Sequence, residues 1–170
     1  QYSNIWVGHH STGVDFLSAQ KSEFRHMDFG HAVYTLVPTT DGSGLWMASE
    51  GGLGHWQQGR FTGTWLFKNN IRREYSFPRC LMADRSQHVW IGIDDQGVYR
   101  FDSRTGQFKA IPISPEGADY HAFAEDSEGR IWIGGEFGVY TYQNGKVTRQ
   151  EAISQTIHAP VSGFVQAAPH

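Results

Sequence analysis

The stretch "GRIWIGGEFGVYTY", from Gly129 to Tyr142, decides the fold because shorter versions of it occur three more times in the same chain. Each version centres on a tryptophan between apolar residues and a small residue that follows: NIWVG, GLWMA, HVWIG and RIWIG. The tryptophans are Trp6, Trp46, Trp90 and Trp132, which are 40, 44 and 42 residues apart. A period of this length indicates one supersecondary unit that is used four times.

The residues around each tryptophan predict four strands per unit. A glycine that begins a further apolar run follows every tryptophan, at Gly13, Gly52, Gly97 and Gly138. Hairpin signals come next in the last two units, "DSRTGQF" and "QNGKV", and Asn-Gly is a strong two-residue turn. Another short apolar run that ends in a turn precedes the tryptophan, as in "HAFAEDSEG".

Composition supports an all-β chain. Aromatic residues make up 14% of the 170 residues and there are 20 glycines, whereas long helical periodicity is missing. The segment "RQEAISQTIHAP" is the single helix-tolerant piece, and we expect a loop or one turn there. The net charge is -3 with 18% charged residues, which favours neither a nucleic-acid partner nor a polybasic contact with a membrane. The sequence contains no run of 18 apolar residues, so it predicts no membrane insertion of this segment.

Four antiparallel strands repeated every 40 to 44 residues predict a β-propeller. Its blades pack radially, so that each sheet is covered by the next, and the repeated tryptophans are expected to be packing residues. Residues 1–170 are interpreted as one propeller domain or segment, with four units centred on the four tryptophans.

The third and fourth units also resemble a known family. "LMADRSQHVWIGIDDQGVYRFDSRTGQFKAI" and "FAEDSEGRIWIGGEFGVYTYQNGKVTR" are similar to the two-component regulator propeller repeat, which has a "DxxGxIWIG" core before a "GLxxYDxxTGxF" hairpin. The first two units match more loosely. Unit two has one extra residue before its tryptophan in "TTDGSGLWMAS", and unit one has no recognisable hairpin turn in "FLSAQKSEF".

The resemblance implies a function. In this family the propeller is usually the extracytoplasmic, periplasmic sensor head of a histidine kinase, a hybrid regulator or a diguanylate cyclase. By this resemblance the chain is expected to bind a small molecule or oligosaccharide and to pass the signal on through the remainder of a sensor protein. It is not expected to be an enzyme itself, because any catalytic output would lie in kinase or cyclase domains.

The two ends of the chain are complementary in pattern. "QYSNIWVG" begins at the second strand of a unit, and "VSGFVQAAPH", residues 161–170, is typical of an innermost strand. Residues 161–170 are therefore predicted to complete the first blade. A closed four-bladed ring and an arc of a larger propeller both fit, and the arc includes the hypothesis of a homodimer that forms an eight-bladed ring.

Ligands of propellers usually sit on the face where the loops between second and third strands meet the segments that lead into the innermost strands. Carboxylates, an arginine and imidazoles on these segments can hydrogen-bond hydroxyl groups, and aromatic rings can stack on a sugar. The predicted ligand-binding residues are His9, His10, His31, Glu50, Arg79, Asp94, Asp95, Tyr120, His121, Glu136 and Phe137.

Metal and nucleophilic chemistry are not predicted. The histidines lack HxH or HExxH spacing, so neither a metal nor a cofactor is expected. Asp84 and Asp126 each lie six residues before a tryptophan and are interpreted as turn acceptors of backbone N–H groups. Cys80, the one cysteine, is expected to be a buried, inert thiol.

Two other classes of function stay open at this stage. A propeller lyase or hydrolase could use a histidine and an acid such as Glu136 at the channel mouth. A protein-interaction scaffold would use the rims for docking. Fold alone does not decide among these functions.

Overall fold

The computed structural model describes residues 5–9, 13–18, 23–28, 32–49, 51–67 and 77–165. In this part of the chain all the long elements are strands, which confirms the prediction of an all-β fold. No described helix is long and apolar enough to cross a membrane.

The described residues form fifteen strands and one short helix. They are β1 (Ile5–His9), β2 (Gly13–Ser18), β3 (Glu23–Asp28), β4 (Val33–Pro38), β5 (Gly44–Ser49), β6 (Gly52–Gln57), β7 (Arg60–Leu66), β8 (Pro78–Ala83), β9 (His88–Ile93), β10 (Gly97–Asp102), β11 (Gln107–Ile111), β12 (Tyr120–Glu125), β13 (Ile131–Gly135), β14 (Gly138–Gln143), β15 (Lys146–Arg149) and α1 (Glu151–Ser154).

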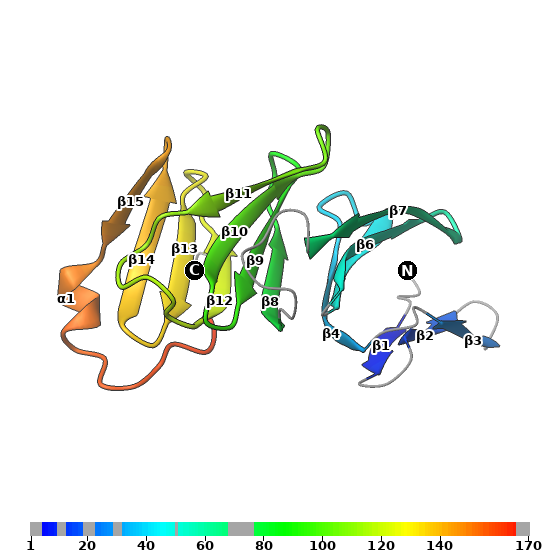
Figure 1. Ribbon diagram of the computed structural model, residues 1–170, viewed down its shortest axis with the longest axis horizontal. Coiled ribbons are helices and arrows are strands. Elements are labelled where there is room, and N and C mark those ends of the chain that lie inside the picture. The colour runs from blue at the N-terminus through cyan, green and yellow to red at the C-terminus, as the bar shows by residue number, and fades with distance from the viewer. Residues whose placement is uncertain are drawn as a thin grey trace, which may run out of the picture.

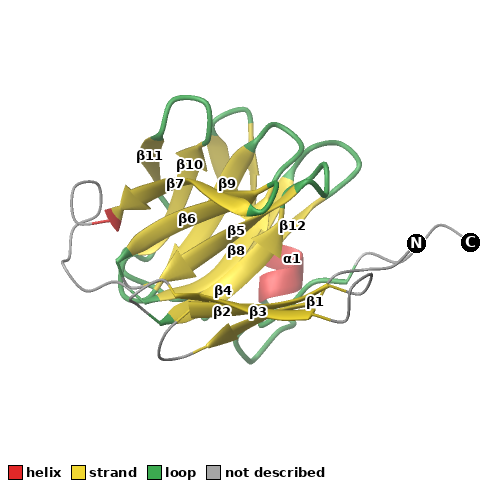
Figure 2. Cartoon of the chain, turned by 90° about the vertical axis from the view of Figure 1, so that its right-hand side faces the viewer, coloured by secondary structure: helices red, strands yellow, loops and turns green. Residues whose placement is uncertain are grey.

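The strands form four antiparallel sheets, one for each tryptophan unit. Three of them have four strands in chain order, β4 to β7, β8 to β11 and β12 to β15, and the first has β1, β2 and β3 among its described strands. The sheets stand side by side in an arc (Figure 1). The first strands face inward, since β4 contacts β8 and β8 contacts β12. Figure 2 looks at this arc from the side of the first sheet.

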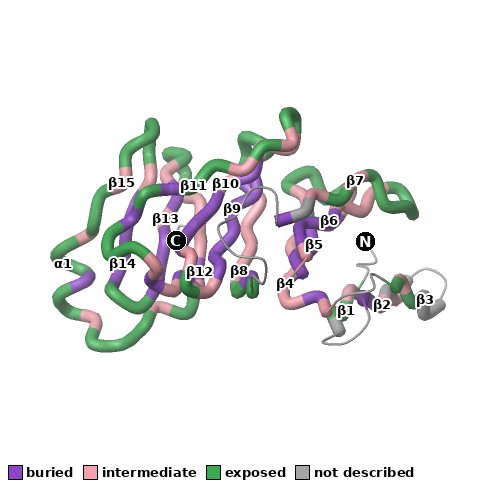
Figure 3. The backbone as a smooth tube through the Cα atoms, viewed as in Figure 1, coloured by how far each residue is buried: buried purple, intermediate pink, exposed green. Residues whose placement is uncertain are grey.

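The repeated tryptophan packs each sheet against the next one. Trp46 lies in one cluster with Val89 and Ile91 of the third sheet, and Trp90 lies in another with Ile131 and Ile133 of the fourth. Side chains alternate along a strand, so the tryptophan faces the following blade while its apolar neighbours face the preceding one. The central strands β5, β9 and β13 are therefore the most deeply buried (Figure 3). The packing role predicted for the tryptophans is confirmed for Trp46 and Trp90, and Trp6 packs partly buried against the second sheet, whereas Trp132 is half-buried.

Asp84 and Asp126 hold the turn before the tryptophan, as predicted, and they also bind the indole itself. Asp84 accepts hydrogen bonds from the backbone N–H of Ser86 and His88 at 2.9 and 2.8 Å and from Trp90 Nε1 at 2.9 Å. Asp126 repeats the pattern, with Trp132 Nε1 at 2.8 Å. One carboxylate thus fixes both the turn and the packing side chain.

The predicted turns are also present. Asn144 and Gly145 have φ of 51° and 82°, as a two-residue turn between β14 and β15 requires. The helix-tolerant segment forms the single turn α1, in which Ser154 Oγ accepts a hydrogen bond from the backbone N–H of Val139 at 3.0 Å.

The C-terminal segment packs on the fourth sheet. Val161 donates its backbone N–H to Gly135 O at 3.1 Å, and Val161 and Phe164 lie against Gly134. Residues 161–165 form no strand, and residues 166–170 lie outside the described part of the chain. The completion of the first blade by residues 161–170 stays a prediction.

Candidate functional site

The predicted ligand-binding residues that the structure describes lie on the rim opposite the β10–β11 and β14–β15 hairpins, which point upward in Figure 1. The β9–β10 and β13–β14 loops contribute to this rim, together with the segments that lead into β8 and β12. Their residues are brought close because β8 and β12 are adjacent inner strands. Four of the predicted residues cannot be placed: the side chain of His9 is not described, and His10, His31 and Glu50 lie outside the described residues.

Arg79 and Asp94 form a forked ion pair. Arg79 Nε lies 2.6 Å from both carboxylate oxygens of Asp94, and Nη2 lies 2.6 Å from Oδ2. The hydrogen bonds to Asp94 raise the pKa of the Arg79 guanidinium. The Arg79 side chain is 59% exposed, so it lies at the surface with its charge matched by a carboxylate that is 16% exposed.

Asp119, which the sequence analysis did not select, connects the β9–β10 loop with the β13–β14 loop. Asp119 Oδ1 accepts a hydrogen bond from the backbone N–H of Asp95 at 2.8 Å. The Asp119 carbonyl accepts one from the N–H of Glu136 at 3.1 Å, and its own N–H lies 3.5 Å from Glu136 Oε2. Asp119 is therefore a positioning residue of this rim. The signal available in the sequence was its place just before the innermost strand, where Tyr120 and His121 were selected instead.

The two aromatic residues of the predicted site have different environments. Tyr120 is 2% exposed and packs edge to face against Tyr140, with ring centroids 6.0 Å apart. Burial raises the pKa of Tyr120, and its buried hydroxyl has no hydrogen-bond partner in the described structure. Phe137 is 50% exposed on the β13–β14 loop, so it is the ring that a ligand can meet from solvent. His121 is half-buried on β12.

The sequence predicts a buried thiol at Cys80, and the structure places this residue at intermediate burial on β8. It donates a hydrogen bond to Tyr120 O at 3.3 Å, and burial raises its pKa to about 12, so the thiolate is not populated at neutral pH. The described residues contain no group of three histidine, cysteine or acidic side chains that could hold a metal ion.

The rim combines one forked ion pair, several carboxylates on short loops and an exposed ring. Carboxylate and guanidinium groups bind hydroxyls, and Phe137 offers an apolar face. Radially packed four-stranded sheets with such a rim define a β-propeller protein.

The particular repeat is identified by sequence comparison. Residues 115–137, which cover the segment before β12, β12 itself, β13 and part of the following loop, match the family described as Two component regulator propeller. This match agrees with the resemblance predicted for the fourth unit and covers its first two strands. No curated protein sequence matches the chain.

Solved structures share the fold. The extracellular domain of the hybrid two-component system BT4673 from B. thetaiotaomicron matches 94% of this chain with a TM-score of 0.73 and 19% identity. That of BT3049 from the same organism matches 85% with a TM-score of 0.68 and 17% identity. This chain spans 23% and 21% of the length of those two chains.

An enzyme shares the fold as well. Virginiamycin B lyase from Staphylococcus aureus matches 87% of this chain and 52% of its own, with a TM-score of 0.70 and 11% identity. Identities this low show the fold alone, so none of these likenesses carries chemistry by itself.

Proposed function

We propose that this chain is an arc of blades from the extracytoplasmic, ligand-sensing propeller of a bacterial signal-transduction receptor. The family repeat at residues 115–137 supports the receptor class, and the solved structures of similar fold include extracellular domains of two-component systems. The remainder of such a receptor would carry the output.

The observation that supports an arc of a larger propeller is an uncovered face of the first sheet. Ile5 and Val7 flank Trp6 in β1 and are 55% and 46% exposed. Their counterparts in the next three sheets are almost fully buried by the preceding blade: Leu45 2%, Met47 1%, Val89 1%, Ile91 0%, Ile131 3% and Ile133 0%. A further blade in front of β1 would cover this face as the other faces are covered.

The ligand site of this proposal is the rim around Arg79, Asp94, Asp95, Glu136 and Phe137. Its charged groups are arranged to receive hydroxyl groups, and Phe137 is placed to contact the apolar face of a sugar. An oligosaccharide or another polar small molecule fits this chemistry.

A binding screen tests the proposal. The chain would be mixed with a panel of neutral oligosaccharides, and thermal shift and calorimetry would report binding while chromatography would report turnover. Saturable binding without turnover, weakened by Arg79→Ala, supports the proposal. Arg104→Ala is the matched control, because Arg104 pairs with Asp102 on the opposite rim.

Three outcomes count against the proposal. Turnover of a panel member indicates an enzyme. Binding that Arg79→Ala and Arg104→Ala reduce equally removes the rim as the site. No binding of any oligosaccharide in the panel, together with specific capture of a protein partner, indicates an interaction scaffold.

A further inference from the structure

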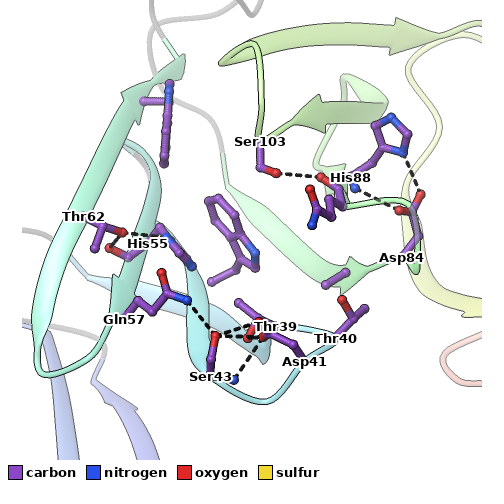
Figure 4. Close-up of a pocket in the computed structure, with 14 residues that line it drawn as sticks. Thr39, Thr40, Asp41, Ser43, His55, Gln57, Thr62, Asp84, His88 and Ser103 are labelled. Atoms are coloured by element: carbon purple, nitrogen blue, oxygen red, sulfur yellow. Dashed lines mark hydrogen bonds and ion pairs between the residues drawn. The ribbon is translucent and has the colours of Figure 1, made fainter.

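A cavity of about 400 Å³ opens between the second and third blades, on the rim opposite the proposed ligand site. Figure 4 shows His55, Gln57 and Thr62 on one side of it and Ser103, His88 and Asp84 on the other. Thr39, Asp41 and Ser43 form its floor in the β4–β5 turn. Cavities of this size hold small molecules.

The cavity exists because the second unit departs from the repeat. In the third and fourth units an aspartate six residues before the tryptophan accepts the indole N–H, at 2.9 Å for Asp84 and 2.8 Å for Asp126. The corresponding position before Trp46 is Thr40, and the nearest aspartate stands one residue later, at position 41. Asp41 bonds Thr39 and Ser43 instead, so within the described chain the Trp46 indole N–H has no acceptor.

The residue opposite the tryptophan on the next strand also differs. Opposite Trp90 stands Arg100, which donates to Tyr142 Oη at 3.3 Å and helps to fill the interface between the third and fourth blades. The cavity there is about 160 Å³. Opposite Trp46 stands His55, which stacks flat on the indole at 4.1 Å and leaves the larger space.

The polar atoms around the cavity are only partly paired. His55 Nδ1 lies 2.6 Å from Thr62 Oγ1, but the buried Nε2 has no hydrogen-bond partner in the described structure. Asp41 Oδ2 accepts one hydrogen bond, from Ser43, and a carboxylate oxygen can accept another. Trp65 adds a second indole to the lining.

The charge of the lining selects the ligand class. No lysine or arginine occurs among the described residues that line the cavity, and Asp41 and Asp84 would repel an anion. Burial lowers the pKa of His55, so this ring contributes no charge at neutral pH. A simple ammonium ion would suit the carboxylates but would leave the Trp46 N–H without an acceptor. A hydroxyl group can both donate to Asp41 and accept from Trp46.

We propose that this interblade cavity is a second binding site, which takes a neutral polyhydroxylated ligand such as one or two sugar units. The ligand's hydroxyls replace the aspartate that the second unit lacks, and the partly buried Trp65 supplies an aromatic surface on which a sugar can stack. The site is independent of the rim around Arg79, because it is built from the turns at the opposite ends of the strands.

The test measures the NMR signal of the Trp46 indole N–H during a ligand titration. The ¹⁵N-labelled chain is titrated with mono- and disaccharides of glucose, galactose, mannose and xylose, and with sulfate and putrescine as charged probes. Trp46→Phe identifies the Trp46 indole signal. We expect a saturable shift of this signal with at least one neutral sugar and no shift of the Trp90 signal, because Asp84 already bonds the Trp90 indole.

Three variants make the test specific. Asp41→Asn is expected to weaken sugar binding about tenfold or more, since a charged acceptor becomes neutral. Asp102→Asn is the matched control, because Asp102 also holds a turn on this rim through Arg104 but does not line the cavity. Thr40→Asp restores the carboxylate six residues before Trp46 and is expected to abolish binding.

The proposal is wrong if no sugar of the panel shifts the Trp46 signal. It is also wrong if putrescine or sulfate shifts it as strongly as the sugars do, or if Asp41→Asn and Asp102→Asn bind equally well. Loss of binding at the Arg79 rim has no bearing on these outcomes, so the two proposals fail separately.

Discussion

At the scale of single residues, the aspartate before each tryptophan does the most for the blades. Asp84 is 4% exposed and bonds two backbone N–H groups, the His88 ring and the Trp90 indole. Asp84→Asn turns part of this acceptor into a donor that faces other donors. We expect a loss of about 2 kcal/mol, or a melting temperature about 4–8 °C lower, measured by calorimetry.

The control for this substitution is Glu128→Gln. Glu128 is 64% exposed and pairs with Arg130 Nη1 at 3.3 Å, and a surface pair of this kind contributes about 0–1 kcal/mol. Equal losses of unfolding free energy in the two variants would show that Asp84 contributes no more than a surface charge does.

Asp126, the equivalent aspartate of the fourth unit, predicts that the stability of the fold depends on pH. Burial alone would raise the pKa of Asp126, but hydrogen bonds from Trp132 and Arg130 outweigh it and hold the pKa well below the usual 3.8. The unfolded chain therefore binds the proton first as the pH falls. The stabilisation is complete above about pH 5 and is lost progressively as the pH falls toward the folded-state pKa.

Urea unfolding of the wild type and Asp126→Asn between about pH 7 and pH 3 measures this contribution. The two midpoints are expected to differ most at neutral pH and to converge in acid. Midpoints that stay parallel over the whole range would exclude Asp126 as a source of the pH dependence.

At the scale of the elements, the glycine two residues after the tryptophan, in the second strand of a blade, sets the spacing to the segment that packs on that blade. A Cβ at position 92 would lie 2.4 Å from Tyr120 O and 2.7 Å from Cys80 Sγ. A Cβ at position 134 would lie 2.5 Å from Val161 Cγ1, which is a side chain of the C-terminal segment. Gly92→Ala must therefore move a strand of the next blade, whereas Gly134→Ala moves only this segment.

We expect Gly92→Ala to cost about 1–3 kcal/mol and Gly134→Ala less than half of that. Urea unfolding gives both values, and hydrogen exchange at residues 161–165 should increase in Gly134→Ala alone. A larger loss of unfolding free energy in Gly134→Ala would contradict this expectation. It would mean that the C-terminal segment stabilises the fourth blade more than β12 stabilises the third blade.

The elements could be predicted because their signals are local. The tryptophan period, the Asn144-Gly145 turn and the aspartate six residues before tryptophan all lie within one unit. Asp119 and the interblade cavity were missed because their partners come from different units. The absence of an aspartate at position 40 is visible in the sequence, but whether a cavity remains beside Trp46 depends on how two sheets pack, which the spacing within one unit does not determine.

At the scale of the whole molecule, the two outer faces of the arc differ from the inner ones. Trp132 is half-buried, whereas Trp46 and Trp90 are 6% and 1% exposed. At the other end Ile5 and Val7 are exposed at positions that are buried in every other sheet. A face that carries a tryptophan and a face that carries its apolar counterparts are complementary, as they are within the arc.

Contacts of one such face with the other would join copies of the chain head to tail. We expect the purified chain to associate as its concentration rises, because exposed apolar faces of this kind are interaction surfaces. Val7→Glu places a charge on the first sheet and is expected to keep the chain monomeric. Phe61→Glu is the matched control, since Phe61 is 40% exposed on β7 of the second sheet, which is not an outer sheet. Sedimentation velocity gives the mass at each concentration, and a wild-type chain that stays monomeric throughout, or an equal effect of the two variants, would mean that these faces do not receive another blade.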